Sequence, residues 1–172
     1  IRDRANTPVF VCHLSADKSW ALVETSFTYG WIPTEDFAFA NNEFVKNWET
    51  GSYAVIIREH VSVLDARNQF LVQASVGNIF PLEAISGGEI KISVAVADPN
   101  RQAVIRHGFV PEKAAARKPF RFNPVNAAKI ANEMKGEPYG WGGLYGRRDC
   151  CLLYTSDAAD DLLRGDPGSR RY

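Results

Sequence analysis

A tetrapeptide of glycine, an aromatic residue, an aliphatic residue and proline occurs twice in the chain. It reads Gly30-Trp31-Ile32-Pro33 at the first position and Gly108-Phe109-Val110-Pro111 at the second. Glycine permits a tight backbone, and proline ends a strand because it lacks the amide donor. Each tetrapeptide closes a cluster of short β-rich segments, one over residues 1–40 and one over 53–115. The repeat therefore predicts two small β barrels in tandem.

Short runs of β-branched and aromatic residues, separated by turn formers, mark the strands. The expected strands are 8–11 and 20–23 in the first cluster and 53–57, 61–64, 70–72 and 90–96 in the second. In the last of these, Ile90, Ile92, Val94 and Val96 alternate with other residues, which is typical of a half-buried strand. Between the clusters, Asn41-Asn42 predicts the cap of a short helix over 43–49.

A second helix follows the second cluster, after a charged stretch over 112–118 that we interpret as a linker. Asn123 is a good N-cap, Pro124 suits the first helical position and Gly136 supplies a stop. Four residues fall on one apolar face of this helix: Ala127, Ile130, Ala131 and Met134.

A glycine-rich aromatic run comes next and leads to Asp149-Cys150. A cysteine is nucleophilic as its thiolate, and a helix N-terminus lowers the pKa of a thiol placed there. A lone cysteine is more often a small buried apolar residue than a nucleophile. Together with the run before it, we interpret Cys150 as a nucleophile.

The segment Tyr139-Gly140-Trp141-Gly142-Gly143, followed by Asp149-Cys150, resembles the start of the catalytic domain of NlpC-type cell-wall peptidases. This resemblance covers 120–150. The part before it is similar to the paired bacterial SH3-like domains that precede this peptidase in the γ-D-glutamyl–diamino-acid endopeptidase subgroup.

The implied fold is mainly β, with two tandem SH3-like barrels followed by the first helix and turn of an α+β papain-like domain. We expect a first SH3-like domain at 1–40 (incomplete at its N-terminus), a second at 41–115 and the start of the papain-like domain at 116–150.

The resemblance also implies roles for five residues. Cys150 would attack an amide carbonyl of a peptidoglycan stem peptide, with Tyr139 beside it to polarise that carbonyl. Asp149, Tyr29 and Trp141 would bind the substrate. From residue type alone, Tyr139 and Trp141 also fit core aromatics, Tyr29 a packed aromatic at the barrel rim, and Asp149 a helix cap.

The catalytic histidine that the family places after its cysteine is not in the sequence. His13, His60 and His107 all precede Cys150, and we interpret them as surface or satisfied strand histidines. No Cys/His spacing suggests a metal site, and no cofactor is expected. Residues 151–172 depart from the family, because 151–160 back-translate to a transposon-end sequencing adapter; we expect 151–172 not to be native. The chain as given is therefore expected to be inactive.

Composition narrows the remaining classes of function. The net charge is zero, which gives no support to nucleic-acid or membrane-surface binding through bulk electrostatics. No apolar run approaches the ~18 residues of a membrane-spanning helix. The chain opens on Ile1, which we interpret as an interior position of a longer protein, so a signal or anchor is not visible.

Our first hypothesis is a fragment of a peptidoglycan endopeptidase of the bacterial cell envelope. The alternative is a non-catalytic SH3-like module that binds cell-wall peptide. Acyl transfer to an acceptor other than water would use the same nucleophile and base, so the sequence does not separate a transferase from a hydrolase.

Overall fold

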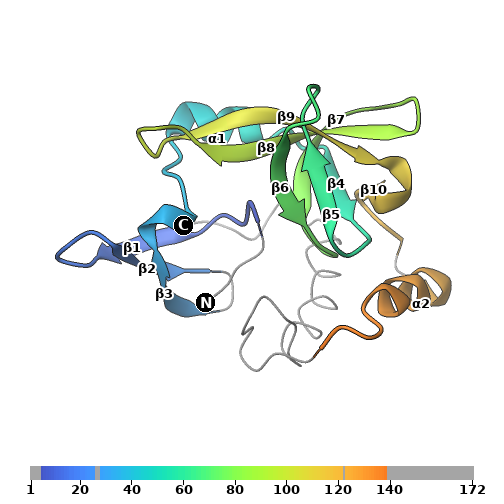
Figure 1. Cartoon of the computed structure of the whole chain (residues 1–172), viewed down its shortest axis with the longest axis horizontal. Coiled ribbons are helices and arrows are strands. Elements are labelled where there is room, and N and C mark those ends of the chain that lie inside the picture. Colours follow the sequence, from blue (N-terminus) through green and yellow to red (C-terminus); the bar gives the residue numbers. More distant parts are fainter. Residues whose placement is uncertain (1–4, 26–27, 122, 139–172) are drawn as a thin grey trace.

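The computed structural model describes residues 5–25, 28–121 and 123–138. Within these ranges the chain forms a three-stranded sheet, a seven-stranded sheet and two α-helices (Figure 1). All the named strands pair antiparallel. This confirms the expectation of a mainly β fold.

The first sheet is a meander of β1 (Phe10–Leu14), β2 (Trp20–Glu24) and β3 (Tyr29–Pro33). Its central strand alternates, with Ala21 and Val23 fully buried and Trp20 and Glu24 exposed. One face of the sheet therefore packs inward and the other faces solvent.

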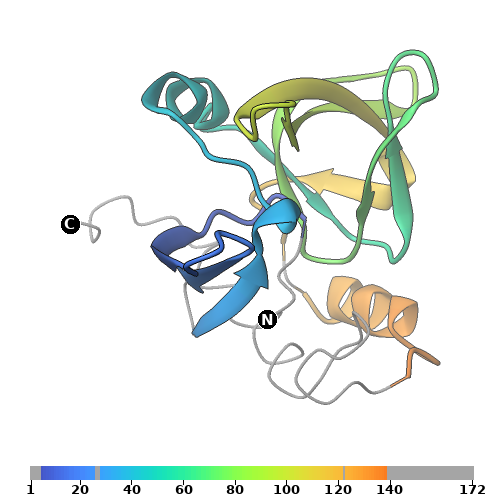
Figure 2. The same cartoon turned by 60° about the vertical axis from the view of Figure 1, so that its left-hand side comes forward.

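The second sheet holds the main hydrophobic core. Its strands are β4 (Tyr53–Ile56), β5 (Val61–Leu64), β6 (Phe70–Ala74), β7 (Ile79–Ser86), β8 (Glu89–Ala97), β9 (Ala103–Pro111) and β10 (Ala115–Arg117). They are ordered β10-β4-β7-β8-β9-β5-β6 and curl around the core as a barrel does (Figure 2). Phe80, Ile92 and Val94 are fully buried in it. The inward alternation expected for 90–96 is confirmed at its first three positions, and Val96 is half-buried.

The two tetrapeptides adopt the same local structure. Each ends a strand, β3 or β9, and each leads into a single 3-10 turn, η1 (Thr34–Asp36) or η2 (Glu112–Ala114). The backbone angles agree closely: φ −60° and ψ 140° at Pro33, φ −58° and ψ 138° at Pro111. The repeat seen in the sequence is therefore a repeat in the fold.

The expectation of a linker over 112–118 was wrong. These residues form η2 and then β10, which pairs with β4, and Ala115 is only 3% exposed. The amide of Lys118 also donates to the carbonyl of Tyr53. Charged residues at the turn and at the strand end suggested a linker, but the short alanines between them fit an edge strand. The sheet thus extends two residues past the boundary expected at 115.

Helix α1 (Asn42–Trp48) lies beside β9, outside the second sheet (Figure 1). The side chain of Asn41 accepts a hydrogen bond from the amide of Phe44 at 2.8 Å, so Asn41 is the N-cap. The rings of Phe44 and Trp48 stack with centroids 5.4 Å apart. The predicted helix over 43–49 is confirmed, displaced by one residue.

Helix α2 (Pro124–Glu133) has the expected cap, since Asn123 Oδ1 accepts from the amide of Asn126 at 2.9 Å. It lies below the β4–β5 end of the second sheet in both views (Figures 1 and 2). None of its residues with a described side chain is buried. On the predicted apolar face, Ile130 and Met134 are half-buried and Ala131 is exposed.

Two short segments join the first domain to the second. The side-chain amide of Asn6 donates to the carbonyl of Ala95 and accepts from its N–H, both at 2.9 Å. The backbone of Phe39 accepts from the amide of Ala103 and donates to the carbonyl of Arg101, both at 2.8 Å. Both contacts fall on the β8–β9 hairpin, and a third, from the side-chain amide of Asn78 to the carbonyl of Ala5 at 2.7 Å, falls between β6 and β7.

Candidate functional site

Tyr29 is the one predicted site residue that falls within the described ranges. Tyr139, Trp141, Asp149 and Cys150 lie outside them, and their roles stay predictions. The described part of the candidate site is therefore the part that the first SH3-like domain contributes.

Tyr29 is the first residue of β3 and pairs with Glu24 on β2, which in turn pairs with Phe10 on β1. Because directly paired residues point to the same face, these three side chains form one row across the sheet. Tyr29 is 64% exposed and Phe10 is 69% exposed. The phenol of Tyr29 donates to Glu24 Oε1 at 3.2 Å.

The carboxylate of Glu24 controls the protonation of this phenol. Its negative charge, together with the hydrogen bond it accepts, raises the pKa of Tyr29 above the ordinary value. The shift follows because the hydrogen bond to the carboxylate favours the protonated form of the phenol, which donates it. The row thus presents an anionic acceptor flanked by two aromatic rings.

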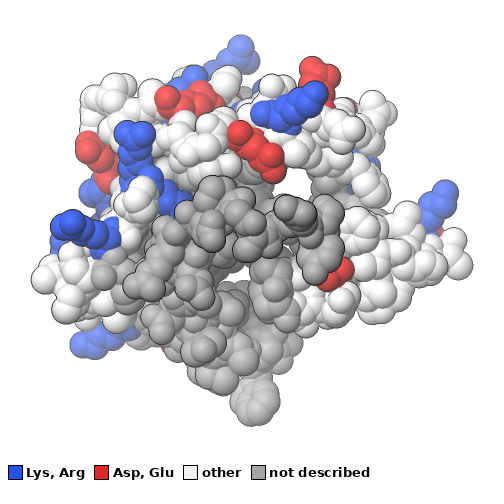
Figure 3. Space-filling view, turned by 180° about the vertical axis from the view of Figure 1, so that it is seen from behind, with Lys and Arg blue, Asp and Glu red and all other residues white. Residues whose placement is uncertain are grey.

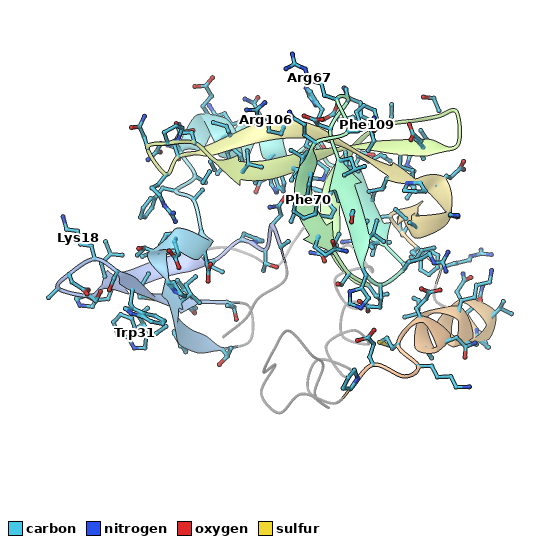
Figure 4. All side chains as sticks on the ribbon, viewed as in Figure 1. Lys18, Trp31, Arg67, Phe70, Arg106 and Phe109 are labelled. Carbon is cyan, nitrogen blue, oxygen red and sulfur yellow. The ribbon has the colours of Figure 1, made fainter. Side chains whose placement is uncertain are left out.

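The next row on the same face contains Leu22 and Trp31, which are direct partners. The ring of His13 meets that of Trp31 edge-on, with centroids 6.3 Å apart. Figure 4 shows Trp31 projecting from the first sheet on the side away from the second domain.

We refer to four exposed residues of this sheet as the first-sheet aromatic face: Phe10, Trp20, Tyr29 and Trp31. Sequence reasoning identified only Tyr29. The alternation within 20–24 could have indicated that Trp20 is exposed. The register that places Phe10 in the same row as Tyr29 depends on strand pairing and cannot be predicted from the sequence of either strand.

The other two histidines are also on the surface, as expected. His60 Nε2 lies 3.0 Å from Glu137 Oε1, and His107 Nδ1 lies 2.6 Å from Glu83 Oε1. Both rings are exposed, 67% and 60% respectively. In the described part of the chain, no three His, Cys, Asp or Glu side chains gather in a way that could hold a metal ion.

Glu83 is the centre of a polar cluster on the second sheet. Burial by itself would raise the pKa of this carboxyl, but hydrogen bonds from Lys91, Ser93 and His107 outweigh it and hold the pKa below its ordinary value. The contacts are short, at 2.7 Å from Lys91 Nζ and 2.7 Å from Ser93 Oγ. The cluster ties β7, β8 and β9 together on their outer side.

A groove of 280 Å³ lies at the end of α2, beside the second sheet. It is lined by Arg58, Glu59, Val61, Ser62, Pro111, Lys113, Ala114 and Glu133. Charges of both signs meet in it, and the surface seen in Figure 3 likewise mixes basic and acidic side chains. Neither described helix combines the length and the apolar character needed to cross a membrane.

Comparison with known families defines the class. Residues 4–33 match the family model of an SH3 domain of the SH3b1 type, and residues 41–84 match that of an SH3 domain of the SH3b2 type. The chain therefore carries tandem bacterial SH3 domains, as the sequence predicted. No curated protein matches the chain.

A solved structure extends this likeness. An NlpC/P60 endopeptidase from Photobacterium damselae subsp. piscicida is 29% identical, with a TM-score of 0.67 over 87% of this chain. The matched region is 32% of that protein, so the chain spans about a third of its length. The two SH3 matches and this likeness together support an NlpC-type peptidase with tandem bacterial SH3 domains.

Proposed function

We propose that the intact protein is a peptidoglycan endopeptidase of the bacterial cell envelope that uses Cys150 as its nucleophile. One observation carries the proposal: an SH3b1 and an SH3b2 domain are followed by the capped helix α2, which ends at Glu133, a few residues before 139–150 in the sequence. This order matches the arrangement that the sequence resemblance implies. The solved endopeptidase supports it over the described part of the chain.

The chemistry is acyl transfer. The Cys150 thiolate attacks the carbonyl carbon of a stem-peptide amide, a C–S bond forms, and the C–N bond breaks as the amine leaves with a proton from a histidinium. Water then attacks the thioester carbonyl carbon and gives up a proton to the same histidine. A C–O bond forms, the C–S bond breaks, and the peptide leaves as a carboxylic acid while the Cys150 thiolate is restored. That histidine belongs to sequence beyond Cys150. Tyr139 would polarise the carbonyl, and Asp149, Tyr29 and Trp141 would hold the peptide.

The first experiment is a long sequencing read through the native locus across the Cys150 codon. We expect the native frame to continue into a papain-like domain with a histidine several dozen residues downstream. If the read instead reproduces 151–172 followed by a stop, the peptidase proposal fails.

The second experiment uses the intact protein. Incubated with purified peptidoglycan, it should release peptide fragments, and Cys150→Ala should release none while unfolding at the same temperature as the wild type. Analysis of the new termini separates the two reaction classes, because a hydrolase leaves a free carboxylate and a transferase leaves a new amide.

The first-sheet aromatic face favours a second candidate function, a non-catalytic module that binds cell-wall peptide. Exposed aromatic rings on a rigid sheet bury large area at low entropic cost when a ligand covers them. In a co-sedimentation assay with purified peptidoglycan, Trp31→Ala should lower the bound fraction of the chain. Phe70→Ala is the matched control, because Phe70 is 60% exposed but belongs to β6 of the second domain. Equal binding by both variants and the wild type would refute this candidate.

A further inference from the structure

Helix α2 meets the second SH3 domain through charged side chains. We propose that the ion pair Arg58–Glu133, with the hydrogen-bond contact His60–Glu137 beside it, forms an ionic latch that holds α2 on this domain and opens as ionic strength rises. The latch consists of described residues alone and does not depend on peptidase activity.

The latch joins residues that are far apart in the sequence. Arg58 and His60 lie between β4 and β5, Glu133 is the last residue of α2, and Glu137 follows four residues later. Arg58 contacts Glu133 Oε1 twice, through Nη2 at 3.1 Å and through Nε at 3.2 Å. His60 Nε2 contacts Glu137 Oε1 at 3.0 Å. Both contacts tie the C-terminal end of α2 and the residues just beyond it to the segment between β4 and β5.

The apolar contacts of α2 are only partial. No residue of α2 with a described side chain is buried, Ile130 is half-buried, and a groove of 280 Å³ lies beside Glu133 at the end of the helix. The latch side chains are themselves accessible, at 45% for Arg58 and 28% for Glu133. Exposed ion pairs of this kind are weak and salt-sensitive.

Salt should therefore act directly on the position of α2. The distance over which charges are screened falls from about 10 Å at 0.1 M salt to about 3 Å at 1 M. The other charged residues that line the groove, Glu59 and Lys113, are of opposite sign and are subject to the same screening. Because the amide of Lys118 fixes the chain to Tyr53, release of the latch would leave α2 attached through residues 119–123. Residues 134–138, which follow α2, would then move with the helix.

Hydrogen–deuterium exchange of the whole chain tests the latch. At low salt, Arg58→Glu should speed exchange in peptides from α2 by about two- to fivefold, the range expected for an exposed pair. The double variant R58E/E133R restores an ion pair of reversed polarity and should bring the rate back towards that of the wild type. In 1 M salt the wild type should exchange as fast as Arg58→Glu.

Arg67→Glu is the matched control, because it makes the same charge change at an exposed arginine between β5 and β6 and should leave α2 unaffected. Exchange in β8 peptides reports on the folding of the second domain. If Arg58→Glu speeds exchange in β8 peptides, the second domain is perturbed and Glu133→Gln replaces it as the test variant. Glu133→Gln breaks the same ion pair from the helix side and should also speed exchange in α2. Two results would overturn the latch. One is unchanged exchange in α2 for whichever of Arg58→Glu and Glu133→Gln leaves exchange in β8 unchanged. The other is a failure of R58E/E133R to slow exchange in α2 towards the wild-type rate.

Discussion

The side chain of Asn6 pairs with the backbone of Ala95 as a neighbouring strand would, with both hydrogen bonds at 2.9 Å. Ala95 lies on β8 beyond the point where β7 stops pairing with it, so its N–H and carbonyl face an open edge. Asn6 completes that edge from the first domain. It does so with φ at 61°, in the left-handed region that asparagine tolerates better than most residues.

Replacing Asn6 should therefore weaken the attachment of the first domain. Asn6→Gly keeps the backbone conformation and loses both hydrogen bonds, which should lower the free energy of unfolding by about 1–2 kcal/mol. Asn6→Ala should cost about 1 kcal/mol more, because alanine resists positive φ. Urea denaturation of the two variants measures both effects. Equal stabilities of Asn6→Gly and the wild type would show that the pairing contributes nothing.

Gly108 is a second position where a small change should have a large effect. A Cβ at this site would lie 2.5 Å from Val63 Cγ1 and 3.0 Å from Val94 Cγ2, inside the core. Gly108→Ala should lower the free energy of unfolding by about 1–3 kcal/mol through overpacking. Thermal or urea unfolding checks this value.

The same clash gives an internal control. Val63→Ala removes the closest atom, so in the double variant G108A/V63A the new methyl fills space that Val63 vacates. The double variant should be more stable than the sum of the single effects predicts. Strict additivity would mean that the clash is relieved in another way.

Glu83 should make stability depend on pH in the acid range. Its pKa is below the ordinary value in the folded protein, so the stabilisation is complete above the unfolded pKa of about 4.3 and is lost as pH falls through the folded pKa. Glu83→Gln should flatten this part of the curve of stability against pH, measured by urea denaturation at a series of pH values. Glu89→Gln, which removes an exposed carboxylate on the same hairpin, is the matched control.

The effect of Glu24 on the pKa of Tyr29 can be measured by spectroscopy. Because the charge of Glu24 raises the pKa of Tyr29, Glu24→Gln should lower that pKa towards its ordinary value of about 10. Ultraviolet titration of tyrosinate measures the change, and Tyr29→Phe identifies which of the tyrosines is responsible. If Glu24→Gln does not move the Tyr29 titration, the phenol and carboxylate do not interact in solution.

The sequence predicted those structural features that depend on residues close together in the chain. The tetrapeptides, the alternation in β8 and the caps at Asn41 and Asn123 each depend on residues within a few positions, and each was confirmed. Strand β7 was not predicted, because Pro81 stands near its start and proline usually argues against a sheet interior. Here Pro81 is fully buried and pairs with Tyr53.

Contacts between distant residues were the part of the site that sequence could not provide. Nothing near Tyr29 in the chain indicates that Phe10 and Glu24 flank it, because the row depends on the register of two strand pairs. The bulge between Val11 and His13 shifts that register by one residue. Likewise, Arg58 and Glu133 are 75 residues apart, and their contact follows only once the sheet and helix are in place.

The segments that follow the two 3-10 turns have different destinations. After η2, the chain returns as β10 to pair with β4 of its own sheet. After η1, it leaves its own sheet, and Phe39 forms a bridge with Gln102 in the second domain. If the first domain occurred without the second, the segment after η1 that contains Phe39 would have no partner for its bridge. The first domain therefore depends on the second for the partner of its closing segment.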